Sequence, residues 1–399
     1  MTYKHKRHFV SAVAIVSAFL TACGGGGGAP EGGIGGSGAP MGSLRMSITD
    51  APSCGYDAVN ITVDKVSVNQ NASAGDGDAG WVDIPVSPPQ RIDLLGLQNG
   101  VLFTLGQTPL ATGTYTQMRL VLASNSGADP LANSVVPTGG EETALTTPSA
   151  QQSGLKANVD IAVAANQLAD FVIDFDACKS VVKAGNSGKY ILKPVIEVVP
   201  NFISGVQGYV DLSLASGSTL VSLEQDGLVV KSTVPDLTGK FVLEPVAPGT
   251  YDLVITAPGH ATAVVTGVVV ADALVTDVNA SSADIVLPSS GEGTVLGAVA
   301  TGLVPIDASL AASQLLSAGT MIEVGELPAD ADTGAYAFTL PVAAPVVAAY
   351  ASGSALVFAP DVSAAGLYSV SATSGGAVKS AVLPPLAAGA TLSQSFTFP

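Results

Sequence analysis

Residues 43–50 of this chain read SLRMSITD, and this stretch decides what kind of fold the sequence can form. Leu44, Met46 and Ile48 alternate with polar residues. Successive side chains of a β-strand point to opposite faces, so this period of two predicts a half-buried strand. Asp50 and Pro52 follow as turn formers, and we expect the Asp50 carboxylate to cap its own backbone there.

The same period of two recurs downstream. Met118, Leu120 and Leu122 predict a strand with one buried face. The opposite face is mixed, and we expect it to be only partly covered; it carries Tyr115, Gln117, Arg119 and Val121. Residues 124–154 are polar and predict a long loop or a loose hairpin. Because Val, Thr, Ile, Gly and Pro dominate over Glu, Lys and Gln, the sequence predicts an all-β chain of short strands and turns.

Six motifs follow in order over this first block. They are SITDAP (47–52), DAVNIT (57–62), DLL (93–95), GTY (113–115), DFD (174–176) and GKYILKP (188–194). On these motifs residues 43–200 resemble domain of unknown function 4382, which is found near the N-terminus of many prokaryotic lipoproteins. The resemblance implies an all-β exported domain and implies no activity.

Residues 201–288 form a second block with its own motifs. They are GVQGYV (205–210), GKFVL (239–243), PGTYDLVI (248–255) and APGH (257–260). Short strands punctuated by turns predict a small sandwich, and the Pro-Gly pair indicates a type II turn. The order resembles the carboxypeptidase regulatory-like domain, a sandwich that is grouped with starch-binding-like, carbohydrate-binding-like folds. That resemblance implies a fold and says little about function.

Residues 289–399 echo the second block, because GTVLGAV (293–299) and DADTGAYAF (330–338) repeat its opening and its Gly-Lys-Phe strand. The Pro-Gly-Thr-Tyr turn is missing, and residues 311–316 are compatible with one or two helical turns. We interpret this block as a degenerate second β-sandwich that closes with a strand at 393–398. The predicted fold class is therefore a tandem array of β-sandwich domains.

The N-terminal segment predicts a lipid anchor. A basic start (residues 4–7) is followed by an apolar run (9–20), the sequence LTAC (20–23) and unbroken glycines (24–28). This is the order of a secretory signal, and the small residues before Cys23 resemble the lipobox of bacterial lipoproteins. The resemblance implies cleavage before Cys23 and acylation of Cys23, and two or three acyl chains anchor a protein stably.

We therefore assign residues 1–22 to a lipoprotein signal peptide and residues 23–42 to a Gly-rich tether. Gly24, rather than Asp, follows the cysteine, which favours the outer membrane of the cell envelope. The alternative is an ordinary signal peptide that leaves Cys23 as a free thiol. The apolar run is too short for a transmembrane anchor, which takes about 20 residues.

Charge excludes some partners. The chain has 15 Lys and Arg against 32 Asp and Glu, a formal net charge of −17. Nucleic-acid binding needs basic residues, so it is not expected. Docking on anionic lipid is equally disfavoured, and the expected membrane contact is the lipid anchor.

Cysteine counting predicts one disulfide. Of three cysteines, Cys23 is assigned to lipidation, which leaves Cys54 and Cys178. An exported protein lies in a compartment where disulfides form, so we expect these two to pair. The chain-entropy model gives roughly 4–5 kcal/mol as an upper estimate for so long a loop. The alternative is two separate buried thiols.

The sequence singles out no catalytic group. His260 is the only histidine beyond the signal peptide, it lies in a Pro-Gly-His turn, and no Gly-x-Ser-x-Gly motif accompanies it. A zinc site needs several His or Cys ligands, and no phosphate-binding loop has the right spacing. We expect no enzyme and no cofactor apart from the calcium considered next, and an envelope hydrolase ranks last among the functions.

Three carboxylates are the one group of candidate metal ligands in this sequence. If Cys54 and Cys178 pair, Asp50 comes near Asp174 and Asp176, and hard oxygen ligands of this kind suit Ca²⁺. The competing interpretation is that Asp50 caps a turn and that Asp174 and Asp176 lie on a solvated edge.

Binding of glycans rests on fold analogy at this point. Trp81 is the only tryptophan, and sugar-binding modules present flat aromatic rings. Tyr209, Phe241 and Tyr251 follow strand patterns that predict core positions. We expect a non-catalytic structural or binding role for a lipoprotein of the cell envelope; the alternative is a carbohydrate-binding or adhesive surface module, whose partner is a glycan or an envelope protein.

Overall fold

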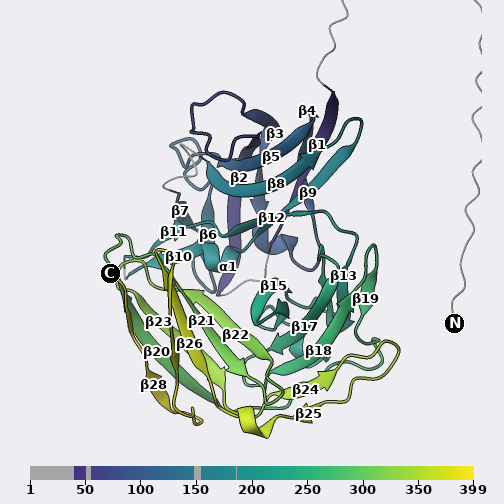
Figure 1. The fold of residues 1–399 in the computed structure, drawn as a ribbon. Coiled ribbons are helices and arrows are strands. Elements are labelled where there is room, and N and C mark those ends of the chain that lie inside the picture. The colour runs from purple at the N-terminus through teal and green to yellow at the C-terminus, as the bar shows by residue number, and fades with distance from the viewer. Residues whose placement is uncertain (1–39, 51–54, 148–153, 186) are drawn as a thin grey trace, which may run out of the picture. The chain divides into compact units, whose positions relative to one another are not determined.

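The computed structural model describes residues 40–50, 55–147, 154–185 and 187–399. The signal peptide, Cys23, most of the tether and Cys54 lie outside these residues, so the predictions made for them stay predictions. The described residues all belong to one compact unit, residues 39–399. Nearly all of its regular structure is β-strand, which confirms the predicted all-β class (Figure 1).

The first block has two sheets. One has the strand order β12-β9-β1-β4; the other has the order β10-β11-β7-β6-β2-β5-β8, with β3 paired to β2. Its elements are β1 (Met41–Asp50), β2 (Tyr56–Asn69), β3 (Val82–Asp93), η1 (Leu94–Leu97), β4 (Phe103–Ala111), β5 (Gly113–Leu122), β6 (Ser134–Pro137), β7 (Thr143–Thr146), β8 (Leu155–Val163), β9 (Leu168–Phe175), α1 (Ala177–Ser180), β10 (Val181–Ala184), β11 (Lys189–Leu192) and β12 (Ile196–Pro200). Strand β1 takes in residues 41 and 42, which we had assigned to the tether. The hairpin β6–β7 confirms the loose hairpin expected within residues 124–154.

The core of the first block follows the sequence pattern on one face of its strands. Leu44, Met46 and Ile48 are fully buried, as are Met118 and Leu120. The second face of β5 differs from the prediction. It was expected to be only partly covered, yet its residues Tyr115, Gln117 and Arg119 are buried.

Contacts from the loop after β2 explain this difference. The Gln117 side-chain amide donates to the carbonyl of Ala72, and the Arg119 guanidinium lies against the carbonyl and carboxylate of Asp76. The loop thus folds over β5 and closes a face that its sequence left open.

The second and third blocks each have two sheets. The second has β16-β13-β19 and β15-β14-β17-β18, and the third has β23-β20-β28 and β22-β21-β26-β27. The elements of the second are β13 (Gly205–Tyr209), η2 (Leu212–Leu214), β14 (Leu220–Gln225), β15 (Leu228–Thr233), β16 (Lys240–Leu243), β17 (Gly249–Thr256), β18 (Ala263–Val270) and β19 (Val275–Asp277). Those of the third are β20 (Glu292–Ala300), β21 (Ala308–Leu315), β22 (Met321–Pro328), β23 (Ala335–Pro341), β24 (Val346–Ala349), β25 (Ala359–Pro360), η3 (Val362–Ala364), β26 (Ser369–Ser374), β27 (Ala377–Val382), β28 (Thr391–Ser393) and β29 (Phe396–Thr397).

The two blocks share one pairing scheme. In each, the first strand pairs antiparallel with the fourth strand and parallel with a strand at the end of the block: β13 pairs with β16 and β19, and β20 pairs with β23, β28 and β29. This supports the interpretation of the third block as a repeat. The helical turns considered for residues 311–316 were wrong: most of these residues belong to β21, where a ladder with β22 and β26 overrides the helix propensity of alanine.

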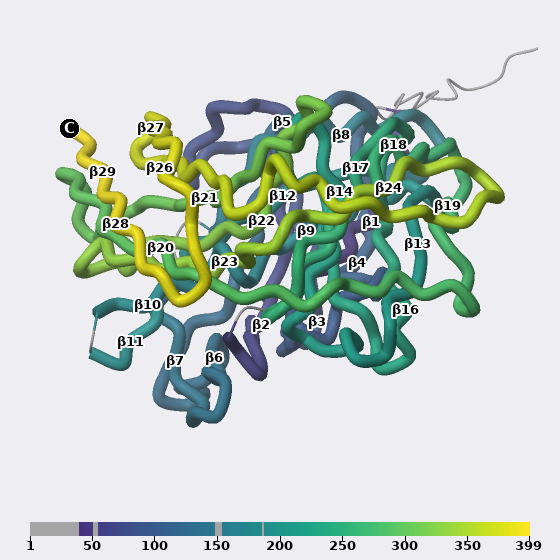
Figure 2. The backbone as a smooth tube through the Cα atoms, turned by 90° about the horizontal axis from the view of Figure 1, so that it is seen from below, coloured from purple at the N-terminus to yellow at the C-terminus, as the bar shows by residue number. Residues whose placement is uncertain are grey.

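One segment of the third block leaves its own sandwich. The second block joins β16 to β17 through residues 244–248 only, whereas residues 342–368 lie between the equivalent strands β23 and β26. This insertion carries β24, which pairs parallel with β18 and extends the sheet of the second block (Figure 2). A strand from the third block is therefore part of a sheet of the second block.

Candidate functional site

Asp50 lies at the end of β1 and is 1% exposed. Its Oδ1 accepts the backbone N–H of Ala177 at 3.0 Å, at the first turn of α1. Burial, together with the charges of Asp176 and Asp174, raises the pKa of Asp50 well above its ordinary value. The turn that Asp50 was expected to cap lies in residues 51–54, outside the described residues; the contact that is visible joins two distant parts of the first block.

Asp174 and Asp176 each form an ion pair, with two different lysines. Asp174 Oδ2 lies 2.6 Å from Lys231 Nζ. Asp176 caps α1 by accepting the N–H of Lys179 at 3.0 Å, and its other oxygen lies 3.4 Å from Lys179 Nζ. Within residues 40–399, apart from the undescribed gaps, no group of three His, Cys, Asp or Glu side chains is arranged to hold a metal ion. The calcium site stays a hypothesis, and these contacts do not argue for it.

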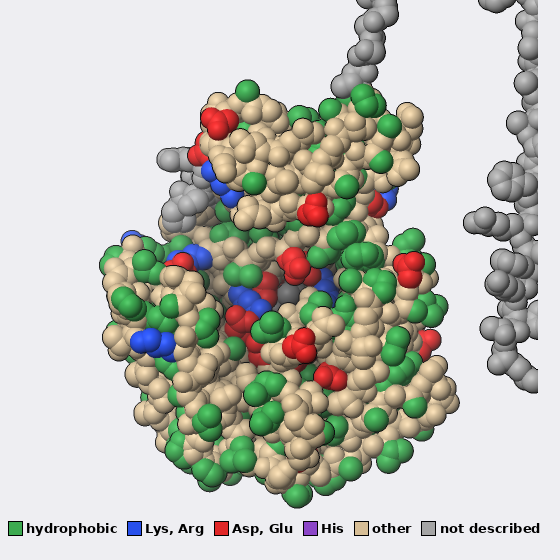
Figure 3. Space-filling model, viewed as in Figure 1, with side chains coloured by type: hydrophobic (Ala, Val, Ile, Leu, Met, Phe, Trp, Pro, Cys, Tyr) green, Lys and Arg blue, Asp and Glu red, His purple; other side chains and the backbone are tan. Residues whose placement is uncertain are grey.

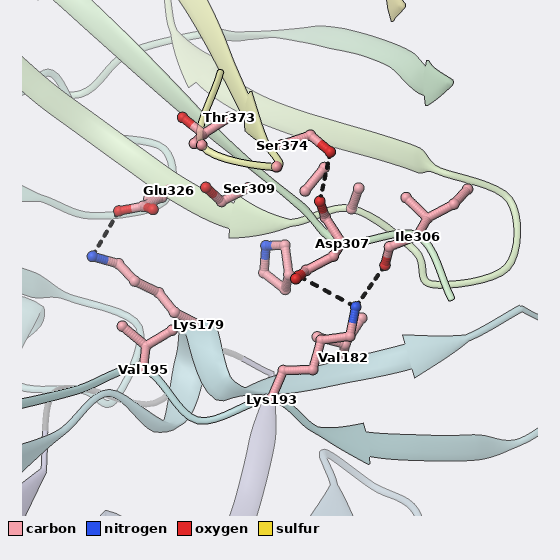
Figure 4. A pocket seen from close by; sticks show the side chains of 15 residues that line it. Lys179, Val182, Lys193, Val195, Ile306, Asp307, Ser309, Glu326, Thr373 and Ser374 are labelled. Atoms are coloured by element: carbon pink, nitrogen blue, oxygen red, sulfur yellow. Dashed lines mark hydrogen bonds and ion pairs between the residues drawn. The ribbon is translucent and has the colours of Figure 1, made fainter. Parts of the chain in front are cut away.

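Helix α1 borders a pocket of about 370 Å³ against the third block. Lys179 Nζ lies 2.6 Å from Glu326, and Lys193 Nζ donates to the carbonyl of Ile306 at 2.6 Å and lies 3.3 Å from Asp307 (Figure 4). Figure 3 shows acidic and basic side chains together in a hollow near the centre of the face that it presents. Burial by itself lowers the pKa of Lys179, but the neighbouring carboxylates raise it above its usual range. These ion pairs hold the first block against the third.

Two glutamates meet where the second block contacts the third. Glu224 on β14 is 1% exposed, and its Oε2 accepts the backbone N–H of Glu323 on β22 at 2.8 Å. Burial raises the pKa of Glu224 to about 8 and that of Glu323 to about 7. Values near neutral pH are those of general acids and bases. Glu224 is too buried to reach a substrate, so we interpret the pair as structural.

A second concave surface lies between β19 and the insertion of the third block. This groove has a volume of about 1320 Å³. The half-buried rings of Tyr209, Tyr350 and Phe358 contribute to its lining, together with the hydroxyls of residues 281, 352 and 354. Its charged lining residues, among those described, are Asp277 and Asp284 alone. The Tyr350 hydroxyl lies 3.4 Å from the carbonyl oxygen of Asp277, so the insertion is tied to the end of β19.

The structure also places the remaining candidates. His260 is partly exposed, and its Nδ1 lies 2.8 Å from the carbonyl of Pro258, which makes it part of a turn. The Arg119 guanidinium lies 3.4 Å from the centre of the Trp81 ring and covers one of its faces. Phe241 and Tyr251 are in the core as expected, whereas Tyr209 is a groove residue and was wrongly expected in the core.

Cys178 is half-buried on α1. Its expected partner Cys54 and the lipidation site Cys23 lie outside the described residues. The pairing and the acylation therefore stay predictions.

Residues 41–194 match the family model described as "Domain of unknown function (DUF4382)". Residues 213–283 match the carboxypeptidase regulatory-like domain. Both resemblances expected from the sequence are thus confirmed, in the expected order. No curated protein matches the chain.

Several solved structures have a likeness to this chain, all with low TM-scores. A cohesin–X-dockerin complex of Acetivibrio cellulolyticus is 26% identical over 22% of this chain and 58% of that one, with a TM-score of 0.18. The TIE protein of Bacillus anthracis is 12% identical over 89% and 50% (TM-score 0.18), and the pilus adhesin SpaC of Lactobacillus rhamnosus GG is 10% identical over 90% and 44% (TM-score 0.15). The chain spans little more than half the length of the first of these structures, and TM-scores this low carry no argument about function.

No described helix is long and apolar enough to cross a membrane.

Sequence reasoning missed Glu224, Glu323 and Tyr350. A glutamate inside the apolar strand that begins at Leu220 was a signal for a buried carboxyl group. Nothing local marked Tyr350, because its place in the groove depends on the pairing of β24 with β18.

Proposed function

We propose that this chain is a lipid-anchored, non-catalytic binding or adhesive module of the cell envelope, held at the outer membrane. The observation that supports a binding role is the groove between β19 and residues 350–358. A long insertion that forms the wall of a concave surface is a common way for a rigid scaffold to carry a binding site. The anchor is supported by the lipobox-like sequence that ends at Cys23.

Protease treatment of intact cells tests the location and the anchor together. We expect the native chain to be shaved from the surface and the Cys23→Ala variant to be released or to stay in the periplasm, because without acyl chains nothing holds it at the membrane. Protection of the native chain until the outer membrane is breached would contradict a surface role. It would favour a periplasmic scaffold instead.

A carbohydrate is the ligand class that the groove favours. Aromatic rings stack on the C–H faces of sugars, while carboxylates and hydroxyls bind sugar hydroxyls. The described lining residues include two aspartates and no lysine, arginine or histidine. This negative charge disfavours anionic ligands. A peptide adding to the edge of β19 is also disfavoured, because Tyr350 already occupies the Asp277 carbonyl.

Affinity gel electrophoresis of the full chain with soluble starch, laminarin and hydroxyethyl cellulose tests this ligand class, with alginate as the anionic control. We expect at least one neutral polysaccharide to retard the protein and Tyr350→Ala to weaken that binding about tenfold. Val357→Ala is the matched control, since Val357 is exposed on the same segment and does not line the groove. Equal binding by Tyr350→Ala, or retardation by alginate alone, would contradict the assignment.

A further inference from the structure

Lys231 is the most enclosed lysine among the ion pairs of the described residues. Its side chain is 4% exposed, whereas the lysines of the other described pairs are 22–41% exposed. It extends from β15 of the second block to Asp174 on β9 of the first block, with Nζ and Oδ2 2.6 Å apart. The Asp174 side chain is 17% exposed, so the lysine is the more enclosed partner; a charge enclosed in this way loses much of its hydration, which makes the contact costly to keep ionic.

A neighbouring contact fixes the strand that carries Lys231. The Asn99 backbone N–H donates to Thr233 Oγ1 at 2.8 Å, which fixes the end of β15 against the first block. The second oxygen of Asp174, Oδ1, is buried and has no hydrogen-bond partner among the described residues. An unsatisfied buried oxygen adds a further penalty to the ionic state.

Glu197 lies directly beside this pair. It is the register partner of Asp174 in the antiparallel ladder of β12 and β9, so both side chains leave the sheet on the same face about 5 Å apart. Glu197 is exposed on β12, and partial desolvation together with the charge of Asp174 raises its pKa above the ordinary value. A lysine, an aspartate and a glutamate are thus assembled from three strands.

We propose that Lys231 and Asp174 condense into an intramolecular isopeptide bond that joins the first block covalently to the second. Nζ attacks Cγ of Asp174, a C–N bond forms, and one carboxylate oxygen leaves as water. The ammonium and the carboxylate together contain every atom of the amide and of that water, so no oxidant, reductant or co-reactant is needed. The ammonium first gives one proton to the Asp174 carboxylate, so that a neutral Nζ attacks a carboxylic acid; Glu197 then takes a second proton from the nitrogen and passes it to the hydroxyl, which leaves as water.

Two physical terms favour condensation here although amides hydrolyse in water. Fixed intramolecular groups react with effective concentrations of about 10⁵–10⁸ M. The amide also removes two buried charges at once. The exposed pair of Lys65 and Asp83, at 2.7 Å, has neither a buried lysine nor this enclosure, and it serves as an internal control that stays ionic.

Mass spectrometry of the full chain, reduced and digested with trypsin, tests the proposal. We expect the peptide 157–179 joined to the peptide that spans Lys231, lighter by one water than the two together, with no cleavage after Lys231. Lys231→Arg keeps the positive charge and is expected to abolish the link, and Glu197→Gln is expected to leave most of the protein unlinked but folded. Separate unmodified peptides and free cleavage after Lys231 would overturn the proposal. Full linkage in Glu197→Gln would overturn the role of Glu197, and a link between Lys65 and Asp83 would overturn the argument from burial.

Discussion

Replacing Cys54 and Cys178 by serine is expected to lower the free energy of unfolding of the first block by about 2–5 kcal/mol. A disulfide between them would close residues 54–178, which hold most of that block, and would restrict its unfolded chain. Cys178 lies on α1, a helix held by Asp50 and Asp176 through hydrogen bonds to its backbone. The crosslink would therefore end on a well-fixed part of the fold.

Denaturant unfolding followed by tryptophan fluorescence measures this effect. Trp81 is the only tryptophan and belongs to the first block, so its emission reports that block rather than the sandwiches. Cys23→Ser is the control and is expected to unfold at the wild-type midpoint. If the wild-type midpoint were the same with and without reductant, Cys54 and Cys178 would not be paired.

The second large effect is a loss of stability as pH rises through neutrality. Glu224 and Glu323 have folded pKa values of about 8 and about 7, above the 4.5 of an ordinary glutamate. The native state therefore binds more protons than the unfolded state between these values, and the free energy of unfolding falls with rising pH. Their stabilising contribution is complete below about pH 4.5 and is lost by about pH 8, a change of up to about 8 kcal/mol for the pair.

Melting temperatures at about pH 5.5 and about pH 8.5 measure this loss. We expect the wild type to melt lower at the higher pH and Glu224→Gln to flatten the dependence, because the amide fills the same space without ionising. Glu141→Gln, at an exposed site of the first block, is the control and is expected to keep the wild-type slope. A Glu224→Gln variant with an unchanged slope would contradict the assignment.

Strands such as β1 were predictable because one of their faces is apolar. The spacing of Leu44, Met46 and Ile48 alone indicated a buried face. The repeated Gly-x-Phe and Gly-x-Tyr motifs indicated two related sandwiches. The failures have one cause. Gln117 and Arg119 are buried by a loop from elsewhere, and β21 forms because two neighbouring strands pair with it.

The amino-acid sequence by itself determined the all-β class, the order of the three blocks and the expectation of a lipid anchor, since all three depend on local spacing and composition. Only the tertiary structure decided which side chains from different blocks lie together. Lys231 reaches Asp174, Glu224 meets Glu323, and Tyr350 joins Tyr209 in the groove. Each of these contacts spans a block boundary, and such a pairing depends on sheet register and on the path of an insertion rather than on any local pattern.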